Sequence, residues 1–266
     1  MSLIPIHLRS LLAASLVGLL ATQAHAGIID LNLSGNTQTD VWETADLSSS
    51  ANPGYPGFPG SGAWPGPIES QAGGDAELMK IANGTGGGPY PGSSSIYFGG
   101  FSGDINNEGG TLSVTDSTPV ADLAYVAFQI EIGEAWTYDF YNGLLPTFSY
   151  NGGSQELTAT LDNLDQEFLG TITMPSGEEN LYNNTYTLSW DLSSITDPIT
   201  DFSISFTGVQ HAQLYALQLD QSDAVPLSTV PEPTSLALFG LGTVGLGYVT
   251  RRRQRKAAEK ATSATT

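Results

Sequence analysis

Residues 124–132 alternate between apolar and polar side chains with a period of two. The apolar positions are Ala124, Val126, Phe128, Ile130 and Ile132, and the positions between them include Tyr125, Gln129 and Glu131. Successive side chains of a strand point to opposite faces, so this pattern predicts a strand with one face in a core. No stretch within residues 27–230 sustains the apolar period of 3.6 that an amphipathic helix needs. The pattern therefore predicts an all-β domain.

Nine further runs follow the same rule and are rich in β-branched and aromatic residues. They cover residues 29–33, 96–101, 111–115, 148–150, 157–161, 168–172, 186–190, 202–206 and 215–219. Turn-forming pairs separate several of them, at Asn142-Gly143, Asn151-Gly152, Asp162-Asn163 and Asp197-Pro198. This spacing predicts an antiparallel two-sheet sandwich of jelly-roll type over residues 27–219. The only helix candidate in this domain is a short one at residues 76–80.

Three segments interrupt or follow the predicted strands. Residues 52–68 contain five prolines and five glycines, which cannot enter a strand ladder, and residues 84–92 are similar. We expect both to be long surface loops or partly disordered insertions. Residues 220–229 are polar, and we expect a linker there between the last strand and the C-terminal segment.

The charge of the predicted domain limits its binding partners, and the lack of cysteine limits the catalytic and metal sites that it can form. Residues 27–229 contain 25 Asp and Glu but only one cation, Lys80, which gives a formal charge of −24. Such a surface repels nucleic acid and anionic lipid headgroups and keeps the protein soluble. The chain has no cysteine, so disulfides, thiolate catalysis and zinc–thiolate sites are excluded. Stability must therefore come from a sizeable apolar core.

The N-terminal segment has the three parts of a secretory signal peptide. His7 and Arg9 precede the apolar run at residues 11–20, and small residues follow at Ala24 and Ala26. A basic region, an apolar region and an A-x-A site in this order predict cleavage after Ala26. The apolar run is too short to span a membrane, which argues against a first membrane helix.

The C-terminal segment also has three parts. A rigid handle, Val230-Pro231-Glu232-Pro233, is followed by an uncharged run at residues 234–250. Behind this run lie the cations Arg251, Arg252, Arg253, Arg255 and Lys256. The run has 17 residues, at the lower limit for a membrane-spanning helix, and the cations are a stop-transfer signal that stays cytoplasmic. We therefore predict a single transmembrane helix with the Pro-Glu-Pro triplet on the opposite side of the membrane.

This tail resembles the PEP-CTERM sorting signal of Gram-negative bacteria that build exopolysaccharide matrices. The resemblance covers about the last tenth of the chain, and the order, the spacing and the Pro-Glu-Pro triplet all match. It implies that a membrane-embedded exosortase recognises the triplet and removes the helix and basic tail. The general secretion machinery would deliver the chain to a transient inner-membrane intermediate. The processed body would then reach the cell surface or extracellular matrix. An ordinary single-pass anchor is the alternative.

Candidate catalytic residues are limited to carboxylates. Glycoside hydrolysis needs two of them, and Glu131, Glu134 and Asp139 lie near the clearest strand, with Trp136 and Tyr138 as candidate sugar platforms. Acidic residues are common throughout this domain, so a solvated strand end is the competing interpretation.

The sequence gives little indication of a catalytic histidine, a nucleotide site or a metal site. His211 is the only histidine of the predicted domain and precedes a strand, which favours a turn residue over a catalytic base. No phosphate loop or dinucleotide fingerprint is present. We predict no obligatory cofactor. Calcium is an open option at Asp104, Asn106 and Glu108, whose oxygen donors lie close together beside a glycine, although the segment departs from an EF-hand loop.

Three aromatic residues in the first Pro/Gly segment, Tyr55, Phe58 and Trp64, are candidate glycan contacts. They would stack on sugar rings, or else fold back onto the edge of the sandwich. Two functional hypotheses follow. The first is a non-enzymatic surface or matrix protein associated with exopolysaccharide and biofilm, and the second is a secreted carbohydrate-active enzyme. Flat sheet faces would favour the first, whereas a cleft with facing carboxylates and aromatic walls would favour the second.

Overall fold

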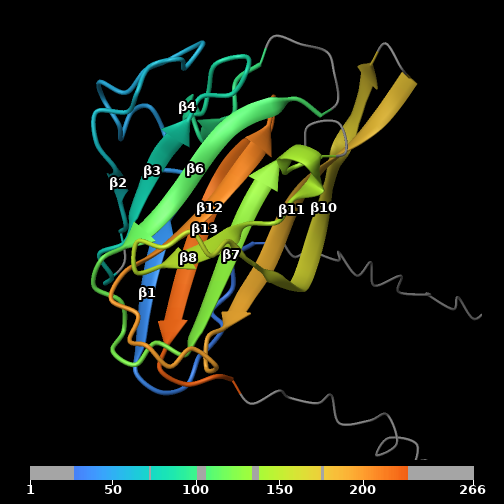
Figure 1. Ribbon diagram of the computed structural model, residues 1–266. Helices are drawn as coiled ribbons and strands as arrows, with labels where there is room; N and C mark the ends of the chain where they lie inside the picture. The colour runs from blue at the N-terminus through green and yellow to red at the C-terminus, as the bar shows by residue number, and fades with distance from the viewer. Residues whose placement is uncertain (1–26, 72, 101–105, 134–137, 175–176, 227–266) are drawn as a thin grey trace, which may run out of the picture.

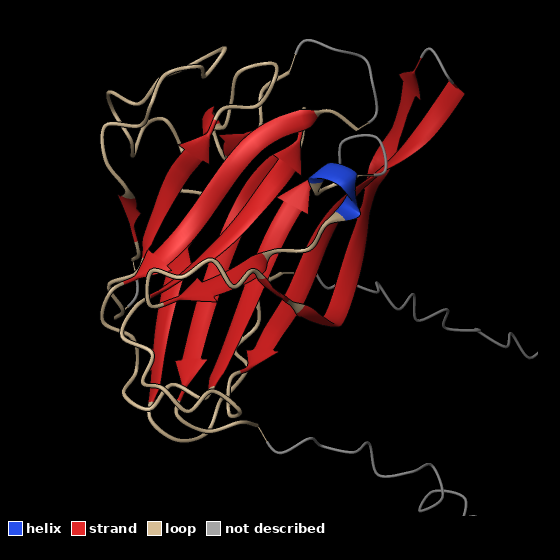
Figure 2. Ribbon diagram, viewed as in Figure 1, coloured by secondary structure: helices blue, strands red, loops and turns tan. Residues whose placement is uncertain are grey.

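The computed structural model describes residues 27–71, 73–100, 106–133, 138–174 and 177–226. Within these ranges the chain forms two antiparallel sheets that pack face to face (Figure 1, Figure 2). The expectation of an all-β, two-sheet antiparallel sandwich is therefore confirmed. The predicted signal peptide, with Ala24 and Ala26, and the predicted tail at residues 230–256 lie outside the described residues.

The larger sheet has seven strands in the order β10-β11-β7-β13-β5-β4, and β1 also pairs with β13. Its strands are β1 (Thr37–Trp42), β4 (Tyr90–Pro91), β5 (Ile96–Tyr97), β7 (Tyr125–Gly133), β10 (Thr160–Met174), β11 (Gly177–Asp191) and β13 (Gln213–Ser222). The predicted strand at residues 124–132 is β7, and it lies near the centre of this sheet, between β11 and β13.

The smaller sheet has six strands in the order β2-β3-β6-β12-β8-β9. They are β2 (Ile68–Glu69), β3 (Glu77–Ala82), β6 (Glu108–Asp116), β8 (Thr147–Tyr150), β9 (Leu157–Thr158) and β12 (Phe202–Val209). A short 3-10 helix, η1 (Tyr141–Gly143), precedes β8. From β6 onward the chain repeatedly crosses between the sheets, as in Greek-key sandwiches such as jelly rolls.

One apolar core fills the space between the sheets. Phe128 of β7 is fully buried and lies 6.1 Å, centroid to centroid, from Phe206 of β12 in the other sheet. Nearby, Phe148 stacks on Phe202 with ring centroids 5.0 Å apart. The alternate apolar residues of each long strand supply this cluster, as the period of two requires. A cysteine-free domain thus obtains its stability from apolar burial.

The helix candidate at residues 76–80 is wrong, because residues 77–80 lie in β3. Ala, Glu, Leu, Met and Lys are strong helix formers, but Leu78 is completely buried opposite Val114 of β6. Pairing with β6 and burial in the core therefore outweigh local helix propensity.

The strand expected at residues 29–33 is also absent. Asn32 has a φ of 48°, which breaks an extended conformation. The backbone N–H of Ile29 instead donates to the side-chain oxygen of Gln129, and the Gln129 amide donates to the Ile29 carbonyl. Gln129 lies on the face of β7 opposite the core, so this segment crosses the outside of the larger sheet.

Two segments expected at the surface are packed instead. Residues 86–91 are buried, and Gly88, with a φ of 63°, approaches the backbone of Phe98 so closely that a Cβ would collide with it. Residues 220–222, expected to begin a linker, belong to β13 and are buried. Their side chains are polar but satisfied. Asp220, for example, accepts hydrogen bonds from Thr39 and Gln218.

The runs expected at residues 157–161 and 168–172 are parts of β9 and of one long strand, β10. The expected turn at Asp162-Asn163 is a bulge in the β10–β11 pairing, and a second bulge falls between Phe168 and Gly170. β7 pairs with β11 only from Asn183 to Asp191. The rest of the hairpin therefore projects beyond the sandwich, and Figure 1 shows it rising away from the body.

Candidate functional site: the outer face of the smaller sheet

Serine and threonine side chains cover the outer face of the smaller sheet. Leu112 and Val114 of β6, and Ile204 and Phe206 of β12, point into the core. The residues between them must therefore point outward. These outward hydroxyl residues are Thr111, Ser113 and Thr115 on β6, Ser203, Ser205 and Thr207 on β12, and Thr147 and Ser149 on β8. We call this set the hydroxyl face.

Strand register places these side chains in rows across the sheet. One row runs Glu77, Thr115, Ser203, Ser149, and the next runs Met79, Ser113, Ser205, Thr147. Neighbouring strands lie roughly 4.8 Å apart, so adjacent hydroxyls interact directly. The Thr111 and Thr207 hydroxyls are 2.8 Å apart, and Ser205 donates to Ser113 over 3.2 Å. The Ser and Thr side chains of these rows are short and of similar length.

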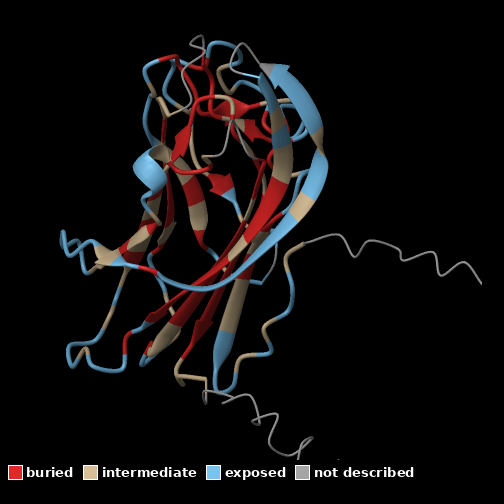
Figure 3. Cartoon of the chain, turned by 90° about the vertical axis from the view of Figure 1, so that its right-hand side faces the viewer, coloured by how far each residue is buried: buried red, intermediate tan, exposed pale blue. Residues whose placement is uncertain are grey.

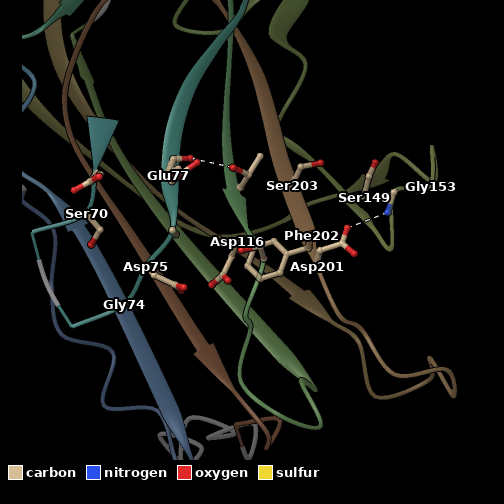
Figure 4. Close-up of a pocket in the computed structure, with 15 residues that line it drawn as sticks. Ser70, Gly74, Asp75, Glu77, Asp116, Ser149, Gly153, Asp201, Phe202 and Ser203 are labelled. Carbon is tan, nitrogen blue, oxygen red and sulfur yellow. Dashed lines mark hydrogen bonds between the residues drawn. The ribbon is translucent and has the colours of Figure 1, made fainter. Parts of the chain in front are cut away.

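An acidic pocket of about 510 Å³ lies at one end of the hydroxyl face (Figure 4). Its carboxylates come from Glu69, Asp75, Glu77, Asp116 and Asp201. Its hydroxyls come from Ser70, Thr115, Ser117, Ser149 and Ser203. Figure 4 shows Glu77, Ser203 and Ser149 in one row across the sheet, with Asp75, Asp116 and Asp201 below them. The pocket and the hydroxyl face are thus continuous.

The charge of this pocket excludes anionic ligands. None of its lining residues, all within the described part of the chain, is Lys, Arg or His. Asp116 is almost fully buried, and burial raises the pKa of its carboxyl above the usual range despite hydrogen bonds from Thr118, Gln221 and Gln38. One backbone N–H and two side-chain amides, rather than cations, thus satisfy this carboxylate. Neutral, hydroxyl-bearing ligands fit such a lining because carboxylates accept hydrogen bonds from hydroxyl groups.

Amide donors support the buried aspartates behind the pocket. The Gln38 amide donates to Asp116 over 3.1 Å and reaches Asp40 at 3.4 Å. Asp40 is fully buried, and burial raises its pKa even though the backbone N–H of Ala76 donates to it over 3.0 Å. The two aspartates therefore share one glutamine between β1 and β6.

The carboxylates proposed for catalysis do not converge where they are described. Glu131 lies on the outer face of the larger sheet, where the amide of Asn183 donates to it. Asp139 lies on the inner side, where Asn184 donates to it over 2.7 Å. Consecutive residues of β11 point to opposite faces, so these two carboxylates are on opposite sides of the sheet. Glu134 and Trp136 lie outside the described residues, and Tyr138 packs against the core.

Asp139 has an unusual environment. Its side chain is 5% exposed, and one oxygen accepts hydrogen bonds from Asn184 and from the Tyr186 hydroxyl at 2.6 Å. The other oxygen has no hydrogen-bond partner among the described residues. Burial raises the pKa of Asp139 to about 6, and the two hydrogen bonds only partly offset this effect. The site therefore stabilises the neutral carboxyl relative to the carboxylate more than water does.

The calcium candidate is only partly visible. Asp104 lies outside the described residues. Asn106 exchanges hydrogen bonds with Asn142, and the Glu108 carbonyl accepts from Thr85. Within the described ranges, no group of three or more acidic or histidine side chains is arranged to hold a metal ion. Calcium binding at Asp104, Asn106 and Glu108 stays a prediction.

Two of the three candidate glycan aromatics fold back onto the domain. Tyr55 and Trp64 form an edge-to-face pair with centroids 5.3 Å apart, and both pack against the core. The Tyr55 hydroxyl donates to the Pro67 carbonyl, and the Trp64 indole donates to the Pro89 carbonyl. Phe58 is 65% exposed at the surface of the same loop. Only Phe58 is therefore presented as a glycan contact would need to be.

The ammonium of Lys80, the one cation of residues 27–229, is bound to the same loop. It donates to the carbonyls of Gly60 and Gly62, and burial lowers the pKa of Lys80 to about 8. His211 occupies the turn between β12 and β13 with a φ of 75°, as the turn hypothesis expects, and its Nδ1 lies 2.6 Å from the Tyr97 hydroxyl.

Sequence reasoning missed the hydroxyl face. The signal was present in T-L-S-V-T at residues 111–115, in S-I-S-F-T at residues 203–207 and in T-F-S at residues 147–149. The apolar residues of each run predict a strand, and the hydroxyl residues between them lie on its other face. The pairing of the three runs side by side depends on the long-range register of β6, β12 and β8, which the local pattern does not specify.

The sorting residues Val230, Pro231, Glu232 and Pro233 and the basic cluster at residues 251–256 lie outside the described residues. Across the part of the chain that the structure describes, no helix has the length and apolar character to cross a membrane.

Comparison with protein families gave one match. Residues 229–254 match the PEP-CTERM protein-sorting motif, which spans the handle, the uncharged run and the first three arginines. Comparison with curated proteins and with solved structures gave no match. The chain thus carries a PEP-CTERM protein-sorting motif at its C-terminal end, the mark of an exported protein that an exosortase recognises and sorts toward the cell surface.

Proposed function

We propose that this chain is a non-enzymatic surface or extracellular-matrix protein of a Gram-negative bacterium. In this account the general secretion machinery exports it through residues 1–26. The tail then holds it briefly in the inner membrane, and an exosortase removes the helix and the basic tail. The processed domain associates with the exopolysaccharide of the biofilm matrix. The sorting motif at residues 229–254 supports the route.

The hydroxyl face is the observation that carries the glycan part of the proposal. It presents seven half-buried Ser and Thr side chains on three neighbouring strands, with the buried Ser113 among them, and it leads into a pocket that holds acceptors for sugar hydroxyls. Its rows of short hydroxyl side chains suit an extended polymer, whereas a cleft would suit a single chain end. The acidic lining and the −24 charge of residues 27–229 favour a neutral polysaccharide over an anionic one.

The alternative is a carbohydrate-active enzyme that uses paired carboxylates. Two observations favour the non-enzymatic proposal. Glu131 and Asp139 occupy opposite faces of the larger sheet, so they cannot act on one bond. The acidic pocket has only one aromatic residue in its lining, Phe202, and that side chain is buried in the core.

A co-sedimentation assay tests the proposal. The mature protein should pellet with an insoluble neutral polysaccharide and not with an anionic one of similar particle size. Ser205→Lys places a long charged side chain in the middle of the hydroxyl face and should weaken binding roughly tenfold, since it blocks contact and removes hydroxyl hydrogen bonds.

Ser94→Lys is the matched control, because it adds the same charge on an exposed loop between β4 and β5. It should bind like the unmodified protein. Equal binding by the two variants, or equal binding to both polysaccharides, would show that the hydroxyl face does not recognise neutral glycan.

A further inference from the structure

The projecting end of the β10–β11 hairpin has no neighbour on either side among the described residues. Residues 177–182 of β11 pair only with residues 168–174 of β10, beyond the point where pairing with β7 ends at Asn183. We call residues 168–174 and 177–182 the arm. Figure 1 shows it standing clear of the sandwich, and Figure 3 shows that its strands are largely exposed.

The arm exposes apolar side chains that a solvated ribbon does not need. Phe168 is 52% exposed, Leu169 is 55% exposed and Ile172 is 40% exposed. Phe168 meets Tyr182 across the ribbon with ring centroids 5.7 Å apart, so the two aromatics shield each other only on one side. A two-stranded ribbon alone is marginal in water, and further strands are needed to make it stable.

The outer edge of β10 is open. β11 is its only partner in the larger sheet, so one row of backbone N–H and C=O groups along this 15-residue strand faces away from the sheet. Long edge strands with apolar side chains are templates for pairing with another chain unless charge protects them. In β10, charged residues protect only the first half of the strand.

The distribution of charge along β10 favours antiparallel over parallel pairing of two copies. Asp162, Asp165 and Glu167 lie in its first half, and residues 168–174 carry no charge. Parallel, in-register pairing of two copies would place each carboxylate beside its equivalent. Antiparallel pairing about Phe168 places the acidic half of each strand against the neutral half of the other, with Leu164 opposite Ile172.

We propose that the arm is a homodimerisation element, in which the β10 strands of two copies pair antiparallel about Phe168 and join their larger sheets. A second copy fits this charge pattern, because the acidic half of one β10 strand would lie against the uncharged half of the other. Because the arm stands away from the sandwich, the two acidic bodies stay apart. Screening of their residual repulsion by salt should strengthen the dimer.

Sedimentation velocity of the mature protein over a concentration series tests this proposal. We expect a monomer–dimer equilibrium that shifts toward dimer as salt is added. The double variant Phe168→Glu/Ile172→Glu adds carboxylates at the pairing edge and should weaken dimerisation roughly tenfold or more. The matched control is Leu144→Glu/Ile81→Glu, which adds the same charge at apolar residues that are 67% and 59% exposed outside the arm.

A thiol variant tests the register without adding charge. The chain has no cysteine, so Phe168→Cys would carry the only thiol, and mild oxidation should join two copies through it. Leu144→Cys should give no such product. A protein that stays monomeric at every concentration overturns the proposal. So does equal dissociation in the two double variants, or a dimer whose Cys at position 168 does not cross-link.

Discussion

Replacing Asp139 with asparagine is expected to remove a large part of the pH dependence of folding stability between about pH 4 and pH 7. The pKa of Asp139 is raised from 3.8 to about 6 by burial, so the folded state holds a proton that the unfolded state releases. The unmodified protein therefore loses stability as pH rises through this window. The loss is about 3 kcal/mol, at about 1.36 kcal/mol for each unit of pKa shift.

Urea unfolding of both proteins at several pH values measures this effect. Burial also raises the pKa values of Asp40, Asp116 and Asp220, which gives both proteins a residual slope of the same sign. The difference between the two stability curves isolates Asp139, because the other three aspartates are unchanged.

Asp191→Asn is the matched control. Hydrogen bonds from Ser193 lower the pKa of this exposed carboxyl, so its removal should change the slope only slightly and in the opposite direction. Parallel curves for the unmodified protein and Asp139→Asn between pH 4 and pH 7 would contradict the account of the Asp139 site.

Truncating Phe128 to alanine is expected to destabilise the protein by about 3–5 kcal/mol. The Phe128 ring is fully buried on β7 and faces Phe206 of the opposite sheet, so its removal leaves a cavity between the sheets. A domain without disulfides has a total stability of only about 5–15 kcal/mol, and this loss is a large share of it.

Phe58→Ala is the control for this prediction, because its side chain is 65% exposed in the Pro/Gly loop. Its effect on urea unfolding should stay within about 0.5 kcal/mol. Similar losses for both variants would mean that the apolar core is not where the structure places it.

The local sequence pattern was sufficient to predict a strand that has one buried and one exposed face. β7 follows from the alternation at residues 124–132, and the turns at Asn142-Gly143 and Asn151-Gly152 follow from residues that tolerate positive φ. Both asparagines do adopt it, with φ values of 55° and 52°. These signals depend only on residues close together in the sequence, and the structure agrees with them.

Local pattern failed where a distant partner decides the conformation. Lys80 and its neighbours favour a helix by local propensity. The segment is a strand because it pairs with β6 and because Leu78 is buried in the core. Residues 220–222 look like a polar linker, yet Asp116, Thr39 and Ser34 supply partners that make their burial possible. Such partners are far away in sequence, so composition cannot reveal them.

The candidate site shows the same division. The sorting motif is contiguous and was recognisable in the sequence, and its match at residues 229–254 confirms it. The hydroxyl face depends on the register of three strands, and the acidic pocket gathers residues from 69 to 203. Neither could be assembled before the topology was known.

Intact-mass analysis of the protein from its native host, in strains with and without the exosortase, tests the central claim most directly. With the enzyme present, the mature chain should begin at Gly27 and should lack Arg251, Arg252 and Arg253. Without it, a membrane-bound species should retain those arginines. A surface-located chain that keeps its C-terminal arginines in the presence of the enzyme, or a cytoplasmic chain that keeps residues 1–26, would contradict sorting through this tail.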